Sequence, residues 1–150
     1  MSSLNIDFFK DLKPQPGPDV KAQQDERALA RREETKKQVT TFANIAEKWQ
    51  LSMDEQLALL GNPARSTYFK WKKEGGILPN DTADRLADIF GIYEALQILF
   101  PEDHASSGWV RQPNSDLMFG GQRAIDLMTR NLVSLHRVRQ VLDTQRGGWA

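Results

Sequence analysis

The stretch GNPARSTYFKWKKEGG, residues 61–76, contains the residue types in this chain that most clearly suggest a binding chemistry. It carries four cationic side chains against a single acid, Glu74, and aromatic residues lie between the cations. Lysine neutralises phosphate, arginine can donate two hydrogen bonds to guanine, and an aromatic ring can contact the methyl group of thymine. This combination is typical of a helix that binds DNA.

A helix over this stretch would have one face to bury and one face free. Ala64, Tyr68 and Trp71 are spaced at i, i+4 and i+7, so they share one side of a helix. We expect this side to pack against a core and the opposite side to be available to a ligand. The predicted DNA-binding residues are Arg65, Ser66, Thr67, Phe69, Lys70, Lys72 and Lys73.

Within this set the expected roles differ with position along the helix. Arg65, Ser66 and Phe69 lie toward the helix N-terminus and are expected to reach the base edges. Lys72 and Lys73 are expected to contact the phosphate backbone. The alternative is a solvated basic helix that binds nothing. One such unit touches few phosphates, so useful affinity for double-stranded operator DNA requires a homodimer that reads two half-sites.

The segments before this stretch supply the elements that would position it. Apolar residues recur at steps of three and four over residues 39–51, as in a helix that faces a core. Ser52 and Glu55 form a capping-box pattern at the start of a second, short helix, and Gly61 is placed to end it. A short helix, a turn with glycine and a basic second helix are the parts of a helix-turn-helix.

Proline, asparagine and glycine predict the ends of the basic helix. Asn62 is a favoured N-cap, and Pro63 suits the first helical position because its missing N–H has no intrahelical partner there. Gly75 and Gly76 are expected to end the helix.

The following segment predicts two further short helices. Asn80 or Asp81 is expected to cap the first, over residues 82–90, and Gly91 to separate it from the second, over residues 92–100. The expected inward face of the first is Ala83, Leu86, Ala87 and Phe90.

The C-terminal third contains more turn-forming residues than the helical segments before it. Turn formers stand at residues 113–114 and 120–121, and residues 109–110 could belong to a short β-hairpin. Two helices are expected after the second turn, over residues 123–131 and 132–146. The apolar stripe of the last helix is Leu135, Val138, Val141 and Leu142.

The N-terminal segment offers little to bury. Residues 1–20 contain PQPGP, which has too few backbone donors to fold alone, although the apolar IDFF before it could dock elsewhere. From Val20 to Arg32 the chain is rich in helix formers and poor in apolar residues. This segment is either a solvated helix or one that forms against a partner.

Composition excludes several classes of protein. The 150 residues carry no net formal charge, although residues 61–80 are net positive, residues 81–103 net negative and residues 104–150 net positive. There is no cysteine, so disulfides and thiolate metal sites are excluded. No apolar run has the length of a membrane span or of a signal-peptide core. We therefore expect a cytoplasmic protein without a membrane partner.

Catalytic patterns are also lacking. The two histidines, His104 and His136, lie in different segments, and no spacing of His, Asp and Glu suggests a metal site. No serine lies in a nucleophile-elbow pattern, and no glycine pair is followed by a phosphate-loop lysine and serine. We expect neither an enzyme nor a cofactor.

The segment GWVRQPNSDLMFGGQRAIDLM, residues 108–128, resembles the toxin-binding domain of the Xre/MbcA/ParS antitoxins. The matching residues are Trp109, Arg111, Pro113, Asn114, Gly121, Asp126 and Leu127. The sequence departs from the family pattern at Gln112, where threonine is usual, and at Ala124, where proline is usual. The family also carries an Xre-like helix-turn-helix, to which residues 59–73 are similar.

This resemblance implies an antitoxin of a type II toxin–antitoxin system. Its partner would be a RES-domain toxin, an enzyme that consumes NAD or transfers ADP-ribose. The C-terminal part would cover the active site of the toxin, and the helix-turn-helix would repress the operon. The implied toxin-binding residues are Trp109, Arg111, Pro113, Asn114, Gly121, Arg123, Arg146, Gly147, Gly148 and Trp149.

Three of these positions have structural alternatives. The tail from Arg146 to Trp149 brings a guanidinium and an indole that suit a cleft built for diphosphate and flat rings, but Trp149 could instead fold back on its own helix. Trp109 could pack in the core instead of touching the toxin. Asp126, in the same motif, could cap a helix and bind no ligand.

Together these patterns predict an all-helical protein with at most one short β-hairpin. We expect an N-terminal arm over residues 1–32, an Xre-like helix-turn-helix domain over residues 33–101 and a toxin-binding domain over residues 107–150. The alternative function is an Xre-like transcriptional repressor whose C-terminal domain senses a small molecule.

Overall fold

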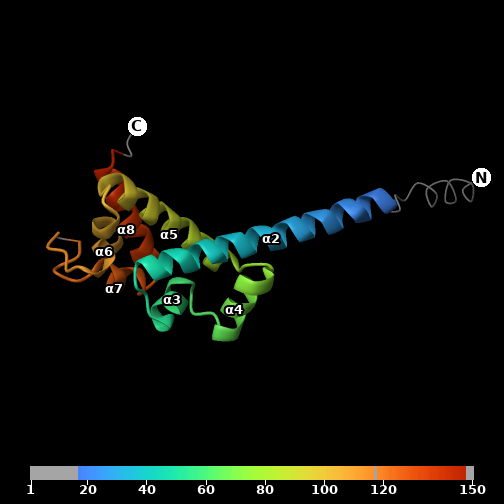
Figure 1. Ribbon diagram of the computed structural model, residues 1–150, viewed down its shortest axis with the longest axis horizontal. Helices are drawn as coiled ribbons and strands as arrows, with labels where there is room; N and C mark the ends of the chain where they lie inside the picture. Colours follow the sequence, from blue (N-terminus) through green and yellow to red (C-terminus); the bar gives the residue numbers. More distant parts are fainter. Residues whose placement is uncertain (1–16, 117, 148–150) are drawn as a thin grey trace, which may run out of the picture. The chain divides into compact units, whose positions relative to one another are not determined.

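The computed structural model describes residues 17–116 and 118–147, and the regular elements in these ranges are helices (Figure 1). They are α2 (Pro18–Lys48), α3 (Met53–Leu59), α4 (Arg65–Glu74), α5 (Asn80–Leu99), α6 (Asp103–Gly108), the short 3-10 helix η1 (Trp109–Arg111), α7 (Ala124–Met128) and α8 (Leu132–Gln145). The prediction of an all-α fold is confirmed. The chain divides into two compact units, residues 1–31 and residues 32–150. Among the described residues, no helix combines the length and apolar character of a membrane span.

Helix α2 joins the two helical segments expected between residues 20 and 51 without a break, but it ends at Lys48, so residues 49–51 follow the helix. Its side chains from Asp19 to Glu34 are exposed, in keeping with a composition that offers little apolar surface. From Thr35 onward one face is buried, and Phe42 and Trp49 are among the largest side chains in the core. The apolar spacing that predicted this face is therefore confirmed.

Helix α3 begins with the predicted capping box. The backbone N–H of Glu55 donates to the Ser52 hydroxyl over 3.1 Å, and the Ser52 N–H donates to the Glu55 carboxylate over 2.9 Å. The two side chains thus satisfy two backbone donors that the first turn of a helix leaves without partners.

The turn between α3 and α4 ends α3 as expected but does not begin α4 as expected. Gly61 has a φ of +92°, which suits a helix-ending glycine, and the Asn62 N–H donates back to the Leu57 carbonyl over 2.8 Å. Asn62 is therefore part of the end of α3, and the prediction that it caps α4 is wrong. The N-cap of α4 is Ala64, and Pro63 precedes it and lies outside the first turn.

Helix α5 runs without interruption through Gly91, so the prediction of two helices separated there is wrong. Gly91 is buried, and a Cβ at this position would overlap the guanidinium of Arg139 from α8. The glycine permits this close approach and does not break the helix. The N-cap is Pro79, so neither Asn80 nor Asp81 caps α5.

The buried face of α5 also differs from the expected one. Ala83 and Ala87 are exposed, and Phe90 is half-buried. The buried residues are Thr82, Leu86, Asp88, Ile89, Gly91, Ile92, Ala95 and Leu96. This face is wider than one stripe because α5 packs along α8 and also meets the turn after α3, where the Thr82 hydroxyl donates to the Leu60 carbonyl over 2.9 Å.

Helix α8 closes the core from the C-terminal side. Leu135, Val138 and Leu142 are fully buried and Val141 is half-buried, which confirms the predicted stripe. These residues belong to the same continuous hydrophobic cluster as the buried residues of α2, α3 and α4. The helix-turn-helix segment and the C-terminal segment therefore share one core.

We predict opposite effects of Gly91→Ala in two backgrounds. In the natural chain the added Cβ displaces the Arg139 guanidinium, which donates to the buried Asp88 carboxylate over 3.3 Å, so the free energy of unfolding should fall by about 1 kcal/mol. In an Arg139→Ala background the three nearest obstructing atoms are gone, and alanine should stabilise the helix by up to about 1 kcal/mol. Urea unfolding followed by circular dichroism measures both; equal effects in the two backgrounds would contradict this account.

Candidate DNA-binding and toxin-binding surfaces

The orientation of α4 is set by two aromatic side chains. Tyr68 is fully buried and Trp71 is 7% exposed. The Tyr68 hydroxyl donates to the Gln56 side chain over 2.8 Å, and its ring meets Phe42 edge-on with centroids 6.1 Å apart. Burial raises the pKa of Tyr68 to about 12, so the hydroxyl keeps its proton at neutral pH. Ala64, expected on the same face, is exposed at the helix start.

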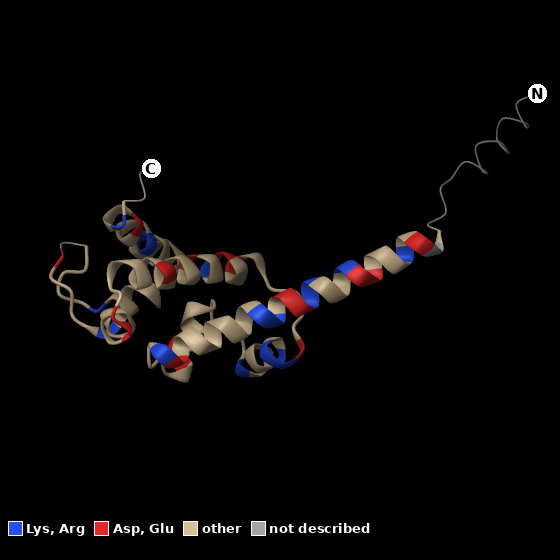
Figure 2. Cartoon of the chain, turned by 45° about the horizontal axis from the view of Figure 1, so that its top comes forward, with Lys and Arg blue, Asp and Glu red and all other residues tan. Residues whose placement is uncertain are grey.

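Figure 2 shows that Lys and Arg residues are concentrated along α4, and most of them are exposed. The exposed residues of the predicted DNA-binding set are Arg65, Ser66, Phe69, Lys70 and Lys73, and Thr67 and Lys72 are half-buried. Lys72 lies against aromatic rings, with its ammonium 5.1 Å from the centroid of Tyr68. Among the described side chains none caps the N-terminus of α4, so its first backbone N–H groups can donate to a phosphate.

Residues 112–116 and 118–123 belong to a loop closed by backbone contacts. Pro113 and Arg123 make an isolated antiparallel bridge. Trp109 and Val110, the pair expected in a short β-hairpin, lie in the 3-10 helix η1, so that expectation is wrong. The Asn114 N–H donates to the Gln122 carbonyl over 3.1 Å, and the Gly121 N–H donates to the Asn114 carbonyl over 2.8 Å. Gly121 has a φ of +85°, a conformation that glycine adopts without strain. Pro113 and Gly121 are exposed at this loop.

An aromatic contact anchors the loop to the core. Trp109 is half-buried and meets the buried Phe119 at nearly right angles, with ring centroids 5.8 Å apart. Of the two roles considered for Trp109, the structure displays the packing role directly. Phe119, which the sequence did not single out, is the partner that fixes the loop from its other side.

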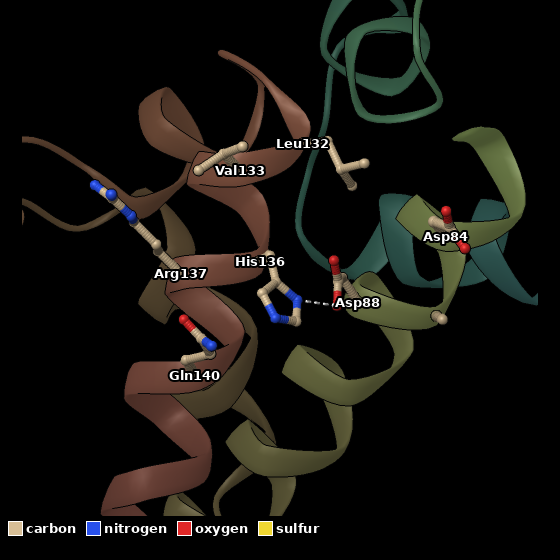
Figure 3. A pocket seen from close by; sticks show the side chains of 8 residues that line it. Asp84, Asp88, Leu132, Val133, His136, Arg137 and Gln140 are labelled. Carbon is tan, nitrogen blue, oxygen red and sulfur yellow. Dashed lines mark hydrogen bonds and ion pairs between the residues drawn. The ribbon is translucent and has the colours of Figure 1, made fainter. Parts of the chain in front are cut away.

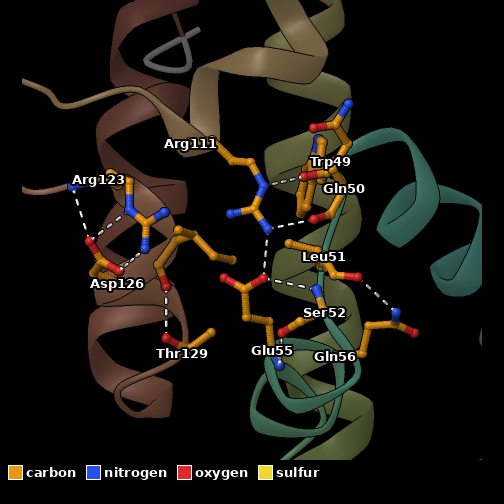
Figure 4. A network of polar contacts seen from close by, with 11 residues as sticks. Trp49, Gln50, Leu51, Ser52, Glu55, Gln56, Arg111, Arg123, Asp126 and Thr129 are labelled. Carbon is orange, nitrogen blue, oxygen red and sulfur yellow. Dashed lines mark hydrogen bonds and ion pairs between the residues drawn. The ribbon is translucent and has the colours of Figure 1, made fainter.

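Arg111 joins the C-terminal segment to the helix-turn-helix (Figure 4). Its guanidinium donates to the Trp49 carbonyl over 2.8 Å, to the Gln50 carbonyl and to the Glu55 carboxylate over 2.6 Å. Gln50 has a φ of +56°, unusual for a residue with a side chain. All three acceptors belong to this chain, so the arginine holds the residues after α2 and the start of α3 next to η1.

The environment of Glu55 favours its charged form. Burial by itself raises the pKa of this carboxyl, but the hydrogen bond from the Ser52 N–H and the ion pair with Arg111 outweigh it and leave the pKa below its ordinary value. The same carboxylate therefore serves the capping box and the contact with the C-terminal segment.

Arg123 and Asp126 form a local pair at the start of α7. The Arg123 guanidinium donates to Asp126 over 2.8 Å, and the Arg123 backbone N–H donates to the same carboxylate over 3.3 Å. The side-chain hydrogen bond from Arg123 lowers the pKa of Asp126 below its ordinary range. Asp126 thus serves as the helix cap that was considered for it.

The tail is described only in part. Arg146 ends α8 and lies 3.9 Å from Glu94 of α5, and Gly147 has a φ of +83°. Gly148 and Trp149 lie outside the described residues.

A surface groove of about 490 Å³ lies between α5 and α8 (Figure 3). Its polar centre is Asp88, which is 5% exposed and accepts from His136 over 3.0 Å and from Arg139 over 3.3 Å. Leu132 and Val133 supply part of its apolar lining. Sequence reasoning missed this cluster because its members are about 50 residues apart. No group of three or more His, Asp and Glu residues in the described parts of the chain is arranged to hold a metal ion.

We predict that Arg111→Ala lowers the free energy of unfolding by about 2 kcal/mol at neutral pH, because it leaves a half-buried carboxylate and two carbonyls without their donor. Arg111→Lys should restore only part of the loss, since an ammonium cannot serve three acceptors with the geometry of a guanidinium. Urea titrations of the three proteins provide the measurement. A change within about 0.5 kcal/mol, as at ordinary surface sites, would show that the contact is dispensable.

The same pair predicts a pH dependence. The folded-state pKa of Glu55 lies below its ordinary value of 4.5, so its contribution to stability is present above that pH and is lost as the pH falls through the folded-state pKa. Removing Arg111 raises the pKa of Glu55 toward its unfolded-state value. The stability difference between the natural chain and Arg111→Ala should therefore shrink on acidification below about pH 4, as measured by urea unfolding at several pH values.

Both segments of the chain are similar to known protein families. Residues 22–90 match the family model of the antitoxin Xre-like helix-turn-helix domain, and residues 95–148 match that of the antitoxin Xre/MbcA/ParS C-terminal toxin-binding domain. The chain is 49% identical over 112 residues to an uncharacterized protein, y4oB, of Sinorhizobium fredii (strain NBRC 101917 / NGR234). The matched region covers 74% of this chain and 85% of that protein. The chain therefore belongs to the Xre/MbcA/ParS family of antitoxins, and it joins a helix-turn-helix to a toxin-binding domain as an antitoxin of a toxin–antitoxin system.

Proposed function

We propose that this antitoxin neutralises a RES-domain toxin by covering its NAD-binding active site, and that it represses its own operon by binding operator DNA as a homodimer in the cytoplasm. The domains are the N-terminal arm of residues 1–32, the helix-turn-helix of residues 33–101 and the toxin-binding segment of residues 107–150. The observation that carries the DNA half is the exposed cationic side of α4 above a buried Tyr68 and Trp71.

The DNA-binding role assigns a task to each side chain on that side of α4. Arg65, Ser66 and Phe69 reach base edges, and the amides at the helix start contact a phosphate. Lys70 and Lys73 contact the backbone. Thr67 and Lys72 are half-buried and lie at the edge of this exposed surface.

We predict that Arg65→Ala combined with Lys70→Ala weakens binding to the operator at least tenfold and reduces the slope of log affinity against log salt concentration by about 1, because Lys70 contacts a phosphate whereas Arg65 contacts a base. Titration of a labelled duplex from the operon promoter at several salt concentrations measures both. The matched control removes two exposed arginines of the C-terminal segment, Arg130 and Arg137, with the same loss of charge. Equal weakening by the control would mean that only net charge matters.

The toxin-binding role rests on the loop of residues 112–123 and on the tail. Pro113 and Gly121 are exposed where a partner can reach them, and Asn114 shapes the loop through its backbone bonds. Trp109 and Arg111 act from beneath by holding the loop in place. Arg123 flanks the loop with a 41% exposed side chain.

The tail supplies groups that suit the cleft of an NAD-consuming enzyme. Arg146 carries a guanidinium that can pair with phosphate, and Trp149 carries a ring that can stack where a base would lie. Gly147 and Gly148 add no side chains that would hinder entry.

We predict that deletion of residues 147–150 restores toxin activity while operator binding stays within twofold of the natural chain. The experiment co-expresses the antitoxin with the product of the adjacent reading frame and follows growth and cellular NAD. Trp149→Ala should reproduce much of the effect, and Ala150→Gly, with one methyl group removed, should not. Full neutralisation by the deleted protein would exclude the tail as the blocking element.

The alternative is a repressor that senses a small molecule, and the groove between α5 and α8 is the observation in its favour. The two functions are separated by the neighbouring gene. The antitoxin proposal requires a neighbour that is toxic alone and harmless with this chain, whereas a harmless neighbour that forms no complex would favour the sensor.

A further inference from the structure

Phe69 is an apolar ring in the middle of a cationic surface. It lies on the outward side of α4 and is 40% exposed, whereas the aromatic residues beside it, Tyr68 and Trp71, are buried. Solvation of lysines does not account for a phenylalanine at this position, because an exposed ring costs free energy in water. Contact with an apolar group of a ligand would remove the exposed part of this ring from water.

The ring is held in one orientation from below. It stacks on Tyr68 with an interplanar angle of 14° and centroids 5.9 Å apart. Tyr68 cannot turn away, because its hydroxyl is bonded to Gln56 and its ring is packed on Phe42. The Phe69 ring is thus restrained by its contact with the buried Tyr68, so the side chain loses little conformational freedom when a ligand binds.

Two cations flank the ring on the same surface. The Arg65 guanidinium carbon lies 5.5 Å from the Phe69 centroid, and the Lys72 ammonium lies 5.3 Å from it. Arg65 is one helical turn before Phe69, so the two side chains leave α4 on the same side. The contact with the ring orients the guanidinium before any guanine is bound.

We propose that Arg65 and Phe69 together read a guanine and an adjacent 5-methylpyrimidine in the major groove. Arg65 donates two hydrogen bonds to the guanine, and the Phe69 ring covers the methyl group of the neighbouring thymine or 5-methylcytosine. Their separation of 5.5 Å compares with a rise of about 3.4 Å between successive bases of one strand, so the two side chains can serve neighbouring bases. Cytosine at that position, which lacks the methyl group, is bound more tightly when it is methylated.

This inference rests on the proposed operator binding and adds the chemistry of the step that is read. Loss of one methyl contact should weaken binding about fourfold, from the transfer free energy of a buried methyl group. The test begins with selection of bound duplexes from a randomised library by the full-length protein. Each thymine of the selected site is then replaced by deoxyuridine, which removes the methyl group and keeps the base pair.

The expected result is one position, beside a guanine, where replacing thymine by deoxyuridine lowers the affinity of the natural chain about fourfold. The same replacement should leave the affinity of Phe69→Ala unchanged. At that position a 5-methylcytosine–guanine pair should bind about fourfold more tightly than a cytosine–guanine pair. Val133→Ala, which removes an exposed apolar side chain from α8, should keep the full deoxyuridine penalty. Phe69→Leu should keep part of it. Circular dichroism verifies that each variant is folded.

The other outcomes separate this inference from the proposed function. Specific binding without a deoxyuridine penalty, or a penalty that persists in Phe69→Ala, would overturn the methyl contact and leave operator binding standing. Loss of binding by Phe69→Ala to thymine and deoxyuridine duplexes alike would assign Phe69 a structural role and overturn the inference as well. Failure of the selection to enrich any sequence would overturn both.

Discussion

The burial of Tyr68 and Trp71 is the constraint on which the exposed cationic side of α4 depends. A helix of ten residues is marginal by itself in water, so α4 owes its stability to the side that packs. Once these two rings enter the core, the rotation of the helix about its axis is determined, and the side chains on the opposite side are left exposed to solvent or to a ligand. The exposed guanidinium, hydroxyl and ammonium groups are thus a consequence of where the aromatic residues go.

That core is shared with the C-terminal segment. Helix α5 packs along α8, and the buried residues of all the larger helices in residues 32–150 form one hydrophobic cluster. Arg111 adds a polar connection, because it binds the carboxylate that also caps α3. A ligand on the loop and a ligand on α4 therefore both stabilise the same folded unit, in proportion to their concentrations and affinities.

The close approach of α8 to α5 requires several local features to agree. Gly91 provides the space, Arg139 fills it, and the buried Asp88 pairs with that arginine and with His136. A buried carboxylate needs such partners because an unpaired charge is costly away from water. The arrangement explains why a glycine stands inside a helix that continues on both sides of it.

Several features of the fold could be predicted from the chain because their causes lie within one or two turns of backbone. The capping box of Ser52 and Glu55, the glycine at the end of α3 and the apolar stripe of α8 each depend on neighbouring residues alone. The same applies to the inward turn of Tyr68 and Trp71, which follows from helical spacing once a core is present. The resemblance of residues 108–128 to a known antitoxin domain was equally a property of the chain.

Only the tertiary structure decided the features whose partners are distant in sequence. Gly91 would end a solvated helix, but packing against α8 carries α5 through it. Asn62 would cap a helix by local preference, but its N–H is committed to the Leu57 carbonyl. Arg111 matches a position of the toxin-binding pattern, yet its donors meet carbonyls and a carboxylate more than 50 residues away. Local rules describe what a residue favours, and long-range packing determines which of its partners is within reach.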